Sequence, residues 1–407
     1  MEQTHLSRRE TVNLGSFYTP PHLVHVVAEM IRRNIAPDFS PQDLTILDSS
    51  CGYGAFFSKE MRDIVPARRF VGGDIDRRAL AVAAQENPDA EFVAANALSQ
   101  ISRDKYGIGN NEPLLIVANP PYNDVTSLVN NAIKSNAPCE IDAGVRTRDL
   151  GISFLLSFAK LTPEFVAVLH PLSYLIKHAN FGLLAPFFAN YALADSIVAN
   201  SHEFSGTSRG TGFPIVVALY KRDCGGWHYR DVEAHNFHTL EGATFSLADF
   251  GYVKNYISKY PSRQQRATTD RADAFKFFAM RDINALKRSR TFISDDNANA
   301  VVVPDDKLEY YCYVDIFKDF AGTLPYYFGN FDVMFDHEKF LAIKGDFLAL
   351  SIDKHPEIFS KKFAAPPENE LAAARSRVRK YFANLFGKHA NARRRHRETM
   401  IAFERVR

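Results

Sequence analysis

The stretch Leu44-Thr-Ile-Leu-Asp-Ser-Ser-Cys-Gly-Tyr-Gly-Ala-Phe-Phe57 predicts a strand, a glycine turn and the start of a helix. The apolar run 44–48 has the length of a strand, and a helical pattern resumes over 55–62 after the turn-forming segment. Gly52 and Gly54 let the backbone turn tightly and approach a ligand, because side chains there would obstruct it. A Gly-x-Gly after a strand is by itself most often a simple turn, so its meaning depends on the motifs further along the chain.

The same order of elements recurs along the first half of the chain. A second strand is expected at 69–74, followed by a helix over 77–87. A third strand is expected at 91–96 and a fourth at 114–119. The pattern continues with helices expected at 151–160 and 181–191 and strands at 165–169, 196–199 and 215–220. Because parallel strands need crossover connections, this order predicts an α/β fold with a mostly parallel sheet, and ligands bind beyond the carboxyl ends of its strands.

After residue 221 the alternation of strands and helices disappears. Short aromatic-rich pieces follow, and a basic helix is expected over 368–386. The sequence therefore predicts two domains, a catalytic domain over 1–230 and a less regular α+β domain over 231–407.

The composition excludes several classes of protein. The longest apolar runs fall far below the roughly 20 residues that cross a bilayer, so we expect no membrane segment. The polar start of the chain lacks the apolar core of a signal peptide, which predicts a cytoplasmic protein. Four cysteines stand far apart without metal-ligand spacing, so we expect neither disulfides nor a bound metal.

A carboxylate ends the second strand about 20 residues after the glycine turn, where it can accept hydrogen bonds from both ribose hydroxyls of an adenosine. Asp74 fills this position. Asp76 is the rival acceptor, but it stands at the start of a helix, where acids are common caps. We favour Asp74.

Asn119-Pro-Pro-Tyr122 directly follows an apolar strand, and its two prolines fix a rigid, extended turn. An amino group conjugated to a purine is a poor nucleophile, because its lone pair is delocalised. Two acceptors, the Asn119 side-chain carbonyl and the Pro120 backbone carbonyl, would free that lone pair for attack on a sulfonium methyl. Pro121 completes the turn, and Tyr122 offers an aromatic face to an extruded base.

Together these motifs resemble the amino-methyltransferases of bacterial restriction-modification systems, in the order called γ. In that order a Phe-x-Thr-Pro segment precedes the glycine loop, the catalytic Asn-Pro-Pro-Tyr and a C-terminal target-recognition domain. Phe17-Tyr-Thr-Pro20 resembles the first segment; taken alone, Thr19 would be read as a helix cap. The resemblance covers about residues 13–222 and implies a Rossmann-like methyltransferase fold that uses S-adenosyl-L-methionine.

The resemblance also implies site residues. The expected cofactor contacts are Phe17, Tyr18, Thr19, Pro20, Asp48, Cys51, Gly52, Gly54, Asp74, Ile75, Asn96 and Asn119. Asn96 stands where the family usually has aspartate, although an amide carbonyl can still accept a hydrogen bond. Besides Tyr122, either Phe204 or Phe213 could stack on the base, and the sequence does not choose between them.

The resemblance implies that the substrate is N6 of adenine in double-stranded DNA. N4 of cytosine needs the same chemistry, but those enzymes more often have serine at the position of Asn119. Cytosine-C5 methylation uses a Pro-Cys thiolate, and Pro138-Cys139 does not stand in the catalytic loop. Protein-glutamine methylation shares the Asn-Pro-Pro-Tyr motif, but its members lack a large C-terminal domain, whereas RNA bases remain an alternative.

Net charge is +2, but basic residues gather toward the C-terminus. We expect Arg393, Arg394 and Arg395 to contact DNA phosphates, although a solvated tail is the plain alternative. A monomer is expected, and a cognate restriction endonuclease acting separately is the partner that the resemblance allows. The DNA sequence that is recognised cannot be derived from the chain.

Overall fold

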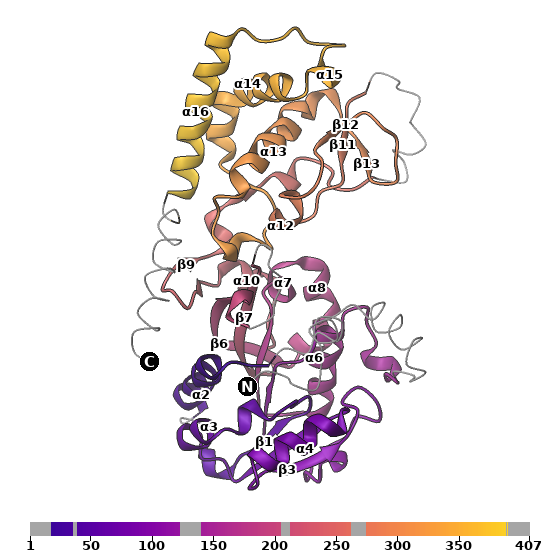
Figure 1. The fold of residues 1–407 in the computed structure, drawn as a ribbon, viewed down its shortest axis with the longest axis vertical. Helices are drawn as coiled ribbons and strands as arrows, with labels where there is room; N and C mark the ends of the chain where they lie inside the picture. The colour runs from indigo at the N-terminus through magenta and orange to yellow at the C-terminus, as the bar shows by residue number, and fades with distance from the viewer. Residues whose placement is uncertain are drawn as a thin grey trace. The chain divides into compact units, whose positions relative to one another are not determined.

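The computed structural model describes residues 18–35, 39–122, 140–204, 212–261, 274–387 and 389. The chain divides into two compact units, Met1–Leu240 and Glu241–Arg407, which Figure 1 colours from indigo to magenta and from salmon to yellow. The boundary falls later than the expected 230/231. The reason is that Leu240 N still donates to Val198 O on a strand of the first unit, at 2.9 Å.

A seven-stranded sheet in the order β3-β2-β1-β4-β5-β7-β6 forms the first unit. Its strands are β1 (Thr45–Asp48), β2 (Arg69–Asp74), β3 (Glu91–Ala94), β4 (Leu114–Ala118), β5 (Phe165–Pro171), β6 (Tyr191–Asn200) and β7 (Pro214–Arg222). Strands β1 to β5 are parallel to their neighbours among these five, and β7 is antiparallel to both β5 and β6. The predicted α/β fold with a mostly parallel sheet is confirmed.

Helices connect and cover these strands, as the labels of Figure 1 show. They are α2 (Pro21–Ile35), α3 (Lys59–Ile64), α4 (Arg77–Glu86), α6 (Leu150–Leu161), α7 (Ser173–Ile176), α8 (His178–Leu183), α9 (Ala185–Phe188) and α10 (Tyr229–Ala234). The single helix expected over 181–191 is wrong, because α8 and α9 are two short helices and Pro186 stands at the start of the second. Strand β6 is correspondingly longer than expected.

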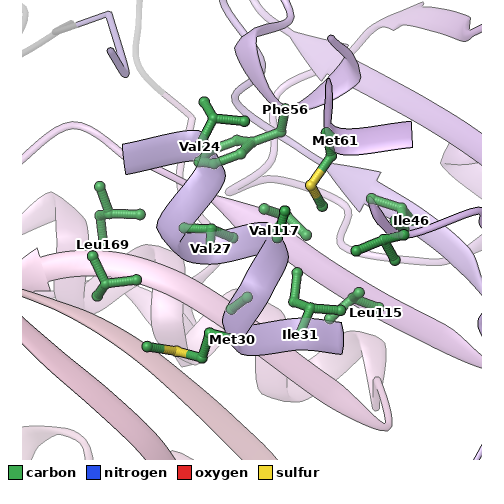
Figure 2. Packing of buried hydrophobic residues seen from close by; sticks show 14 of the residues in the cluster. Val24, Val27, Met30, Ile31, Ile46, Phe56, Met61, Leu115, Val117 and Leu169 are labelled. Atoms are coloured by element: carbon green, nitrogen blue, oxygen red, sulfur yellow. The ribbon is translucent and has the colours of Figure 1, made fainter. Parts of the chain in front are cut away.

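The core of this unit lies where α2 packs on the sheet. Apolar side chains recur on one face of the helix, and Val27 and Ile31 are fully buried. Figure 2 shows them beside Leu115 and Val117 of β4. Because α2 directly follows Thr19 and Pro20 in the chain, this packing fixes where those residues lie.

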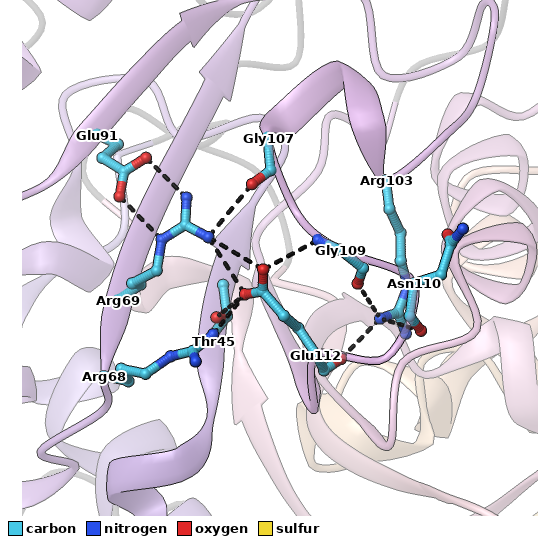
Figure 3. Close-up of polar contacts among 9 residues, drawn as sticks. All are labelled: Thr45, Arg68, Arg69, Glu91, Arg103, Gly107, Gly109, Asn110 and Glu112. Atoms are coloured by element: carbon cyan, nitrogen blue, oxygen red, sulfur yellow. Dashed lines mark hydrogen bonds and ion pairs between the residues drawn. The ribbon is translucent and has the colours of Figure 1, made fainter.

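Charged side chains hold together the amino-terminal edge of the sheet (Figure 3). Glu112, just before β4, pairs with Arg68 at 2.6 Å and with Arg69 at 3.2 Å, and Arg69 also pairs with Glu91 at 2.8 Å. Arg103 is nearly buried and donates only to backbone carbonyls in the described contacts. This edge lies opposite the strand ends where ligands bind in such sheets.

The second unit combines small sheets with longer helices. Its strands are β9 (Thr244–Phe245), β10 (Gly251–Tyr252), β11 (Lys276–Phe278), β12 (Phe292–Ile293), β13 (Ala300–Val302) and β14 (Met334–Phe335), while β8 (Phe237–His238) belongs to the first unit. Its helices are α12 (Ile283–Leu286), α13 (Leu308–Ala321), α14 (His337–Lys354), α15 (Pro356–Phe359) and α16 (Glu368–Phe386). The α+β character and the helix over 368–386 agree with the sequence. Among the described residues, no helix is both long and apolar enough to cross a bilayer.

Candidate methyl-transfer site

Three polar residues meet at the carboxyl-terminal edge of the sheet. Asp48 ends β1, Asp74 ends β2 and Asn119 follows β4, and these strands are neighbours. A pocket at this edge is lined by Tyr18, Thr19, Asp48, Ser50, Cys51, Gly52, Tyr53, Ala55, Phe56 and Asn119. The structure thus brings together side chains from the N-terminal segment, the glycine loop and the Asn-Pro-Pro-Tyr loop.

The glycine loop has left-handed backbone at both glycines, with φ of +51° at Gly52 and +77° at Gly54. A Cβ at Gly54 would come within 3.2 Å of Phe57 and 3.0 Å of Asn87, so tight packing and the positive φ together favour glycine here. A Cβ at Gly52 would meet nothing within 4 Å, and Gly52 lines the pocket. The open space at Gly52 is the kind of cradle in which backbone can approach a ligand closely.

Asp74 orders this loop from the next strand. Its Oδ2 accepts a hydrogen bond from Gly52 N at 2.8 Å, and its Oδ1 accepts one from Asp76 N at 2.9 Å. Burial raises the pKa of Asp74. Asp76 caps α4 by accepting from Arg78 N, as expected, while Ile75 leaves its apolar side chain 69% exposed beside Asp74.

Asp48 is a buried acid beneath the glycine loop. Its Oδ1 accepts a hydrogen bond from Ser50 N at 3.0 Å, and its side chain is shielded from water. Burial, aided by the charge of nearby Asp74, raises the pKa of Asp48 to about 8. The folded protein therefore holds a proton on Asp48 that the unfolded chain releases near its ordinary pKa.

We expect Asp48→Asn to change how stability depends on pH. Between the ordinary pKa of aspartate and about 8, the folded wild type binds one more proton than the unfolded chain. Raising the pH through this window therefore lowers the free energy of unfolding, by at most about 1.4 kcal/mol per pH unit. The asparagine side chain of the variant cannot titrate, so the variant should lose this component of the slope. Urea unfolding of both proteins at several pH values would measure it, and parallel profiles would contradict it.

The Asn-Pro-Pro-Tyr loop is anchored at both ends. Asn119 Nδ2 donates to Thr19 Oγ1 at 3.0 Å, so the Asn119 amide oxygen points away from Thr19. The Tyr122 hydroxyl lies within hydrogen-bonding distance of Leu169 O, at 2.9 Å, and also of Asn119 Oδ1. Burial raises the pKa of Tyr122, which keeps its hydroxyl protonated as a donor.

This geometry changes the interpretation of two residues. Thr19, which would be read alone as a helix cap, instead accepts a hydrogen bond from the Asn119 side chain across 100 residues of sequence. Tyr122 packs its ring against the core cluster of the unit, with its hydroxyl on Leu169 and Asn119. Its role in stacking on a base stays a prediction.

Asn96 is already engaged in local structure. Its Oδ1 accepts from Leu98 N at 2.9 Å and its Nδ2 donates to Glu140 O at 2.8 Å. A hydrogen bond to a cofactor would have to share Oδ1 with Leu98 N, so contact with Asn96 stays a prediction.

The two phenylalanines proposed for stacking differ in burial. Phe204 is 2% exposed and belongs to the hydrophobic core, so its ring offers no face to a base in this structure. The suggestion that Phe204 stacks on the base stays a prediction, and such stacking would require the ring to leave the core. Phe213 is half-buried and remains a candidate.

Several expected residues lie outside the part of the chain that the structure describes. They are Phe17, Cys139, Arg393, Arg394 and Arg395. Cys51 is described, and burial raises the pKa of its thiol well above the usual range, which disfavours a nucleophilic thiolate there.

Sequence reasoning missed four residues that line the pocket, Ser50, Tyr53, Ala55 and Phe56. All four lie within or just after the glycine loop, so their proximity to the predicted residues could have identified them. The sequence gives no indication that the Leu169 carbonyl accepts a hydrogen bond from Tyr122, because any residue can supply a backbone oxygen.

Comparison with protein families gives one match. Residues 4–162 match the family described as N-6 DNA Methylase. The match covers less than half of the chain, so it is a similarity of this segment. Residues 4–162 contain the Phe17-Tyr-Thr-Pro20 sequence, the glycine loop and Asn119-Pro-Pro-Tyr122, in the order of the γ arrangement.

Solved structures of low sequence identity resemble the chain. They are the methyltransferase subunit of a type I restriction-modification system from Streptococcus thermophilus (16% identity, TM-score 0.38, 51% of this chain and 44% of that chain covered), a candidate RNA methyltransferase from Pyrococcus horikoshii (11%, 0.34, 52% and 89%), and a candidate class I S-adenosylmethionine-dependent methyltransferase from Listeria monocytogenes (14%, 0.37, 59% and 75%). The chain thus spans less than half the length of the Streptococcus subunit. No curated protein matches the chain.

S-adenosylmethionine is the cofactor of the N-6 DNA methylase family, and the residue types gathered at this edge of the sheet suit it chemically. The open space at Gly52 admits a ligand against backbone. The exposed Ile75 offers an apolar surface for a flat ring, and Asp74 lies next to it with carboxylate oxygens that can accept from hydroxyls. The apolar surface would suit the adenine ring of the cofactor, and the carboxylate would suit its ribose hydroxyls.

Proposed function

We propose that this protein transfers a methyl group from S-adenosylmethionine to N6 of an adenine flipped out of double-stranded DNA. The observation that carries the proposal is the anchoring of the Asn119 amide. Thr19 accepts from its nitrogen at 3.0 Å, which leaves the amide oxygen as an acceptor at the edge of the glycine-loop pocket. An acceptor held in this orientation suits an exocyclic amino group, because the amino group needs its hydrogens bound before it becomes nucleophilic.

The residues of the loop act by orientation and electrostatics. Asn119 Oδ1 and the Pro120 carbonyl accept the two hydrogens of the adenine amino group, which favours a pyramidal nitrogen and localises its lone pair. Bound S-adenosylmethionine supplies an electrophilic methyl group. With that methyl group supplied, the nitrogen would replace sulfur on the methyl carbon, and the surplus proton on nitrogen would leave to solvent. Holding the two reactants in line lowers the barrier without a covalent enzyme intermediate.

Tyr122 has to give up a hydrogen bond when a base enters the site. Its hydroxyl donates to Asn119 Oδ1, the oxygen that would accept from the adenine amino group. In the proposed mechanism the adenine amino group replaces that hydroxyl on Asn119 Oδ1, and Tyr122 turns its ring against the base. Phe213 is the second aromatic proposed to contact the base.

The cofactor contacts remain those that the motifs predict. In this proposal the N-terminal segment, the glycine loop and the ends of β2 and β3 bind S-adenosylmethionine. The residues are Phe17, Tyr18, Thr19, Pro20, Asp48, Cys51, Gly52, Gly54, Asp74, Ile75, Asn96 and Asn119.

In the same proposal the second unit recognises the DNA target, and Arg393, Arg394 and Arg395 contact phosphates. The protein acts in the cytoplasm as a monomer and serves as the modification enzyme of a restriction-modification system, with any cognate endonuclease acting separately. The family match within residues 4–162 and the order of the motifs support this proposal.

The test is transfer of labelled methyl from S-adenosylmethionine to unmethylated bacterial DNA, to structured RNA and to a mixed protein extract in parallel. We expect label in DNA, and nucleoside analysis should identify N6-methyladenine. N4-methylcytosine in the product would change the target base but keep the amino-group mechanism. Label confined to RNA or to protein glutamine would overturn the assignment of DNA as substrate.

A further inference from the structure

A hollow of about 470 Å³ lies on the second unit, between the end of β11 and α12. Residues that line it include Tyr260, Phe278, Arg281, Arg288, Ser289 and Asn299. Two of these are arginines, and among the described residues no acidic side chain lines the hollow. Its lining therefore combines positive charge with apolar residues.

The two arginines of the hollow are exposed and hold no ion pair within the described part of the chain. Three described arginines of the unit, Arg290, Arg375 and Arg377, differ from Arg281 and Arg288 in this respect. Arg290 pairs with Asp295 at 3.0 Å, and Arg377 pairs with Asp346 at 2.6 Å. Guanidinium groups without an ion-pair partner among the described residues have donors to offer to an external anion.

These arginines stand on either side of the short helix α12, one before and one after it. The helix is tied to the body of the unit, because Ile283 N donates to Phe331 O at 3.0 Å and Asn284 N to Gly329 O at 2.9 Å. Lys318 also donates to Ser289 O at 2.7 Å, next to Arg288. The backbone that carries both guanidinium groups is thus held in place.

The rim of the hollow adds groups that suit nucleotides. Tyr260 is 54% exposed, which is unusual for a large aromatic side chain among the described residues. The neighbouring Lys259 ammonium lies 5.8 Å from the centre of the Tyr260 ring. Asn299 is exposed at the rim and carries an amide that can both donate and accept.

We propose that this hollow binds the backbone of the DNA target, with Arg281 and Arg288 on phosphates and Tyr260 and Asn299 toward sugar and base edges. The inference rests on the proposed function, since it names the surface with which the second unit meets the substrate. Phosphate contacts by arginine and sugar or base contacts by aromatic and amide groups are the usual division in protein–DNA interfaces.

The experiment compares two double variants that each remove two positive charges from the second unit. Arg281→Gln with Arg288→Gln alters the hollow, and Arg375→Gln with Arg377→Gln is the matched control. Both control arginines already have acidic partners, Arg375 with Glu368 at 2.8 Å and Arg377 with Asp346. The affinity of each protein for a DNA duplex is measured over a range of salt concentrations, and S-adenosylmethionine affinity is measured alongside.

In the hollow variant we expect the slope of log affinity against log salt to fall by about 2, roughly 1 for each lost phosphate contact. Affinity at low salt should fall about 10- to 100-fold, with cofactor affinity unchanged. The control should keep the wild-type slope. A wild-type slope in the hollow variant, or an equal loss in the control, would overturn the inference while DNA methylation by the wild type still stood. Absence of DNA methylation in the wild type would instead refute the proposed function.

Discussion

Asn119→Ala is expected to reduce methyl transfer about 100- to 1,000-fold, because it removes one of two acceptors that act on the amino nitrogen in the transition state. Folding should survive, since the side chain makes a half-buried hydrogen bond to Thr19 rather than filling the core. Because Asn119 is also among the proposed cofactor contacts, cofactor affinity is measured separately. Single-turnover methylation of DNA at saturating cofactor is the measurement, with thermal unfolding to check the fold.

Asn190→Ala is the matched control for this experiment. Asn190 is an exposed asparagine of the same unit, in the turn between α9 and β6, and its side chain makes a weak hydrogen bond to Pro186 O at 3.4 Å. We expect its activity to equal that of the wild type. If Asn119→Ala retained more than about a tenth of the activity, an acceptor role for this amide would be untenable.

Arg103→Met is expected to lower the free energy of unfolding by about 4 kcal/mol, the largest stability change that we predict. The guanidinium is nearly buried and donates to the carbonyls of Leu161 and Thr162 at 2.8 Å and of Glu112 at 2.7 Å. Methionine would fill part of the volume but leave these carbonyls without donors. Denaturant unfolding followed by circular dichroism measures the difference.

Arg68→Met is the control, because it belongs to the same edge of the sheet (Figure 3). Arg68 is about half exposed and pairs with Glu112 at 2.6 Å. Such surface pairs contribute about 0–1 kcal/mol, so we expect a small change. Equal losses in the two variants would mean that burial of Arg103 contributes nothing beyond an ordinary surface ion pair.

The central strands could be predicted from sequence because they are buried on both faces. Strand β4 is apolar throughout, and each of its residues is fully covered. Strand β6 is different, since it lies at the edge of the sheet and carries an irregularity between Leu193 and Asp195. Tyr191 is buried, but residues 192–195 are partly or fully exposed and Asp195 interrupts the apolar run, so only 196–199 were expected.

The motifs of the site could be predicted, but the contacts between them could not. The glycine loop, the acid at Asp74 and the Asn119-Pro-Pro-Tyr122 motif can be recognised because the proposed chemistry restricts the residue type at each of these positions. The bond from Asn119 to Thr19 and that from Tyr122 to Leu169 O depend on the packing of α2 and β5, which no local pattern encodes. Burial of Phe204 is a property of the assembled core for the same reason.

Clustering of positive charge along the sequence does not locate the hollow of the second unit. The most prominent basic cluster is the consecutive Arg393, Arg394 and Arg395, whereas Arg281 and Arg288 stand apart among acids and other bases. Their distinction is the absence, among the described residues, of a lining acid in the hollow and of an ion-pair partner. That distinction exists only after neighbouring side chains are placed in three dimensions.

One edge of the main sheet carries stabilising ion pairs and the opposite edge carries the residues proposed for chemistry. This separation affects how stability and specificity can evolve. Arg69, Arg103 and Glu112 fasten the amino-terminal edge, and the residues proposed for chemistry follow the opposite ends of the same strands. Substitutions at the fastened edge can raise or lower thermal tolerance without reshaping the pocket. Natural or laboratory evolution could therefore adapt the protein to a new temperature through substitutions at the amino-terminal edge. Substitutions at the carboxyl-terminal edge could change its specificity independently.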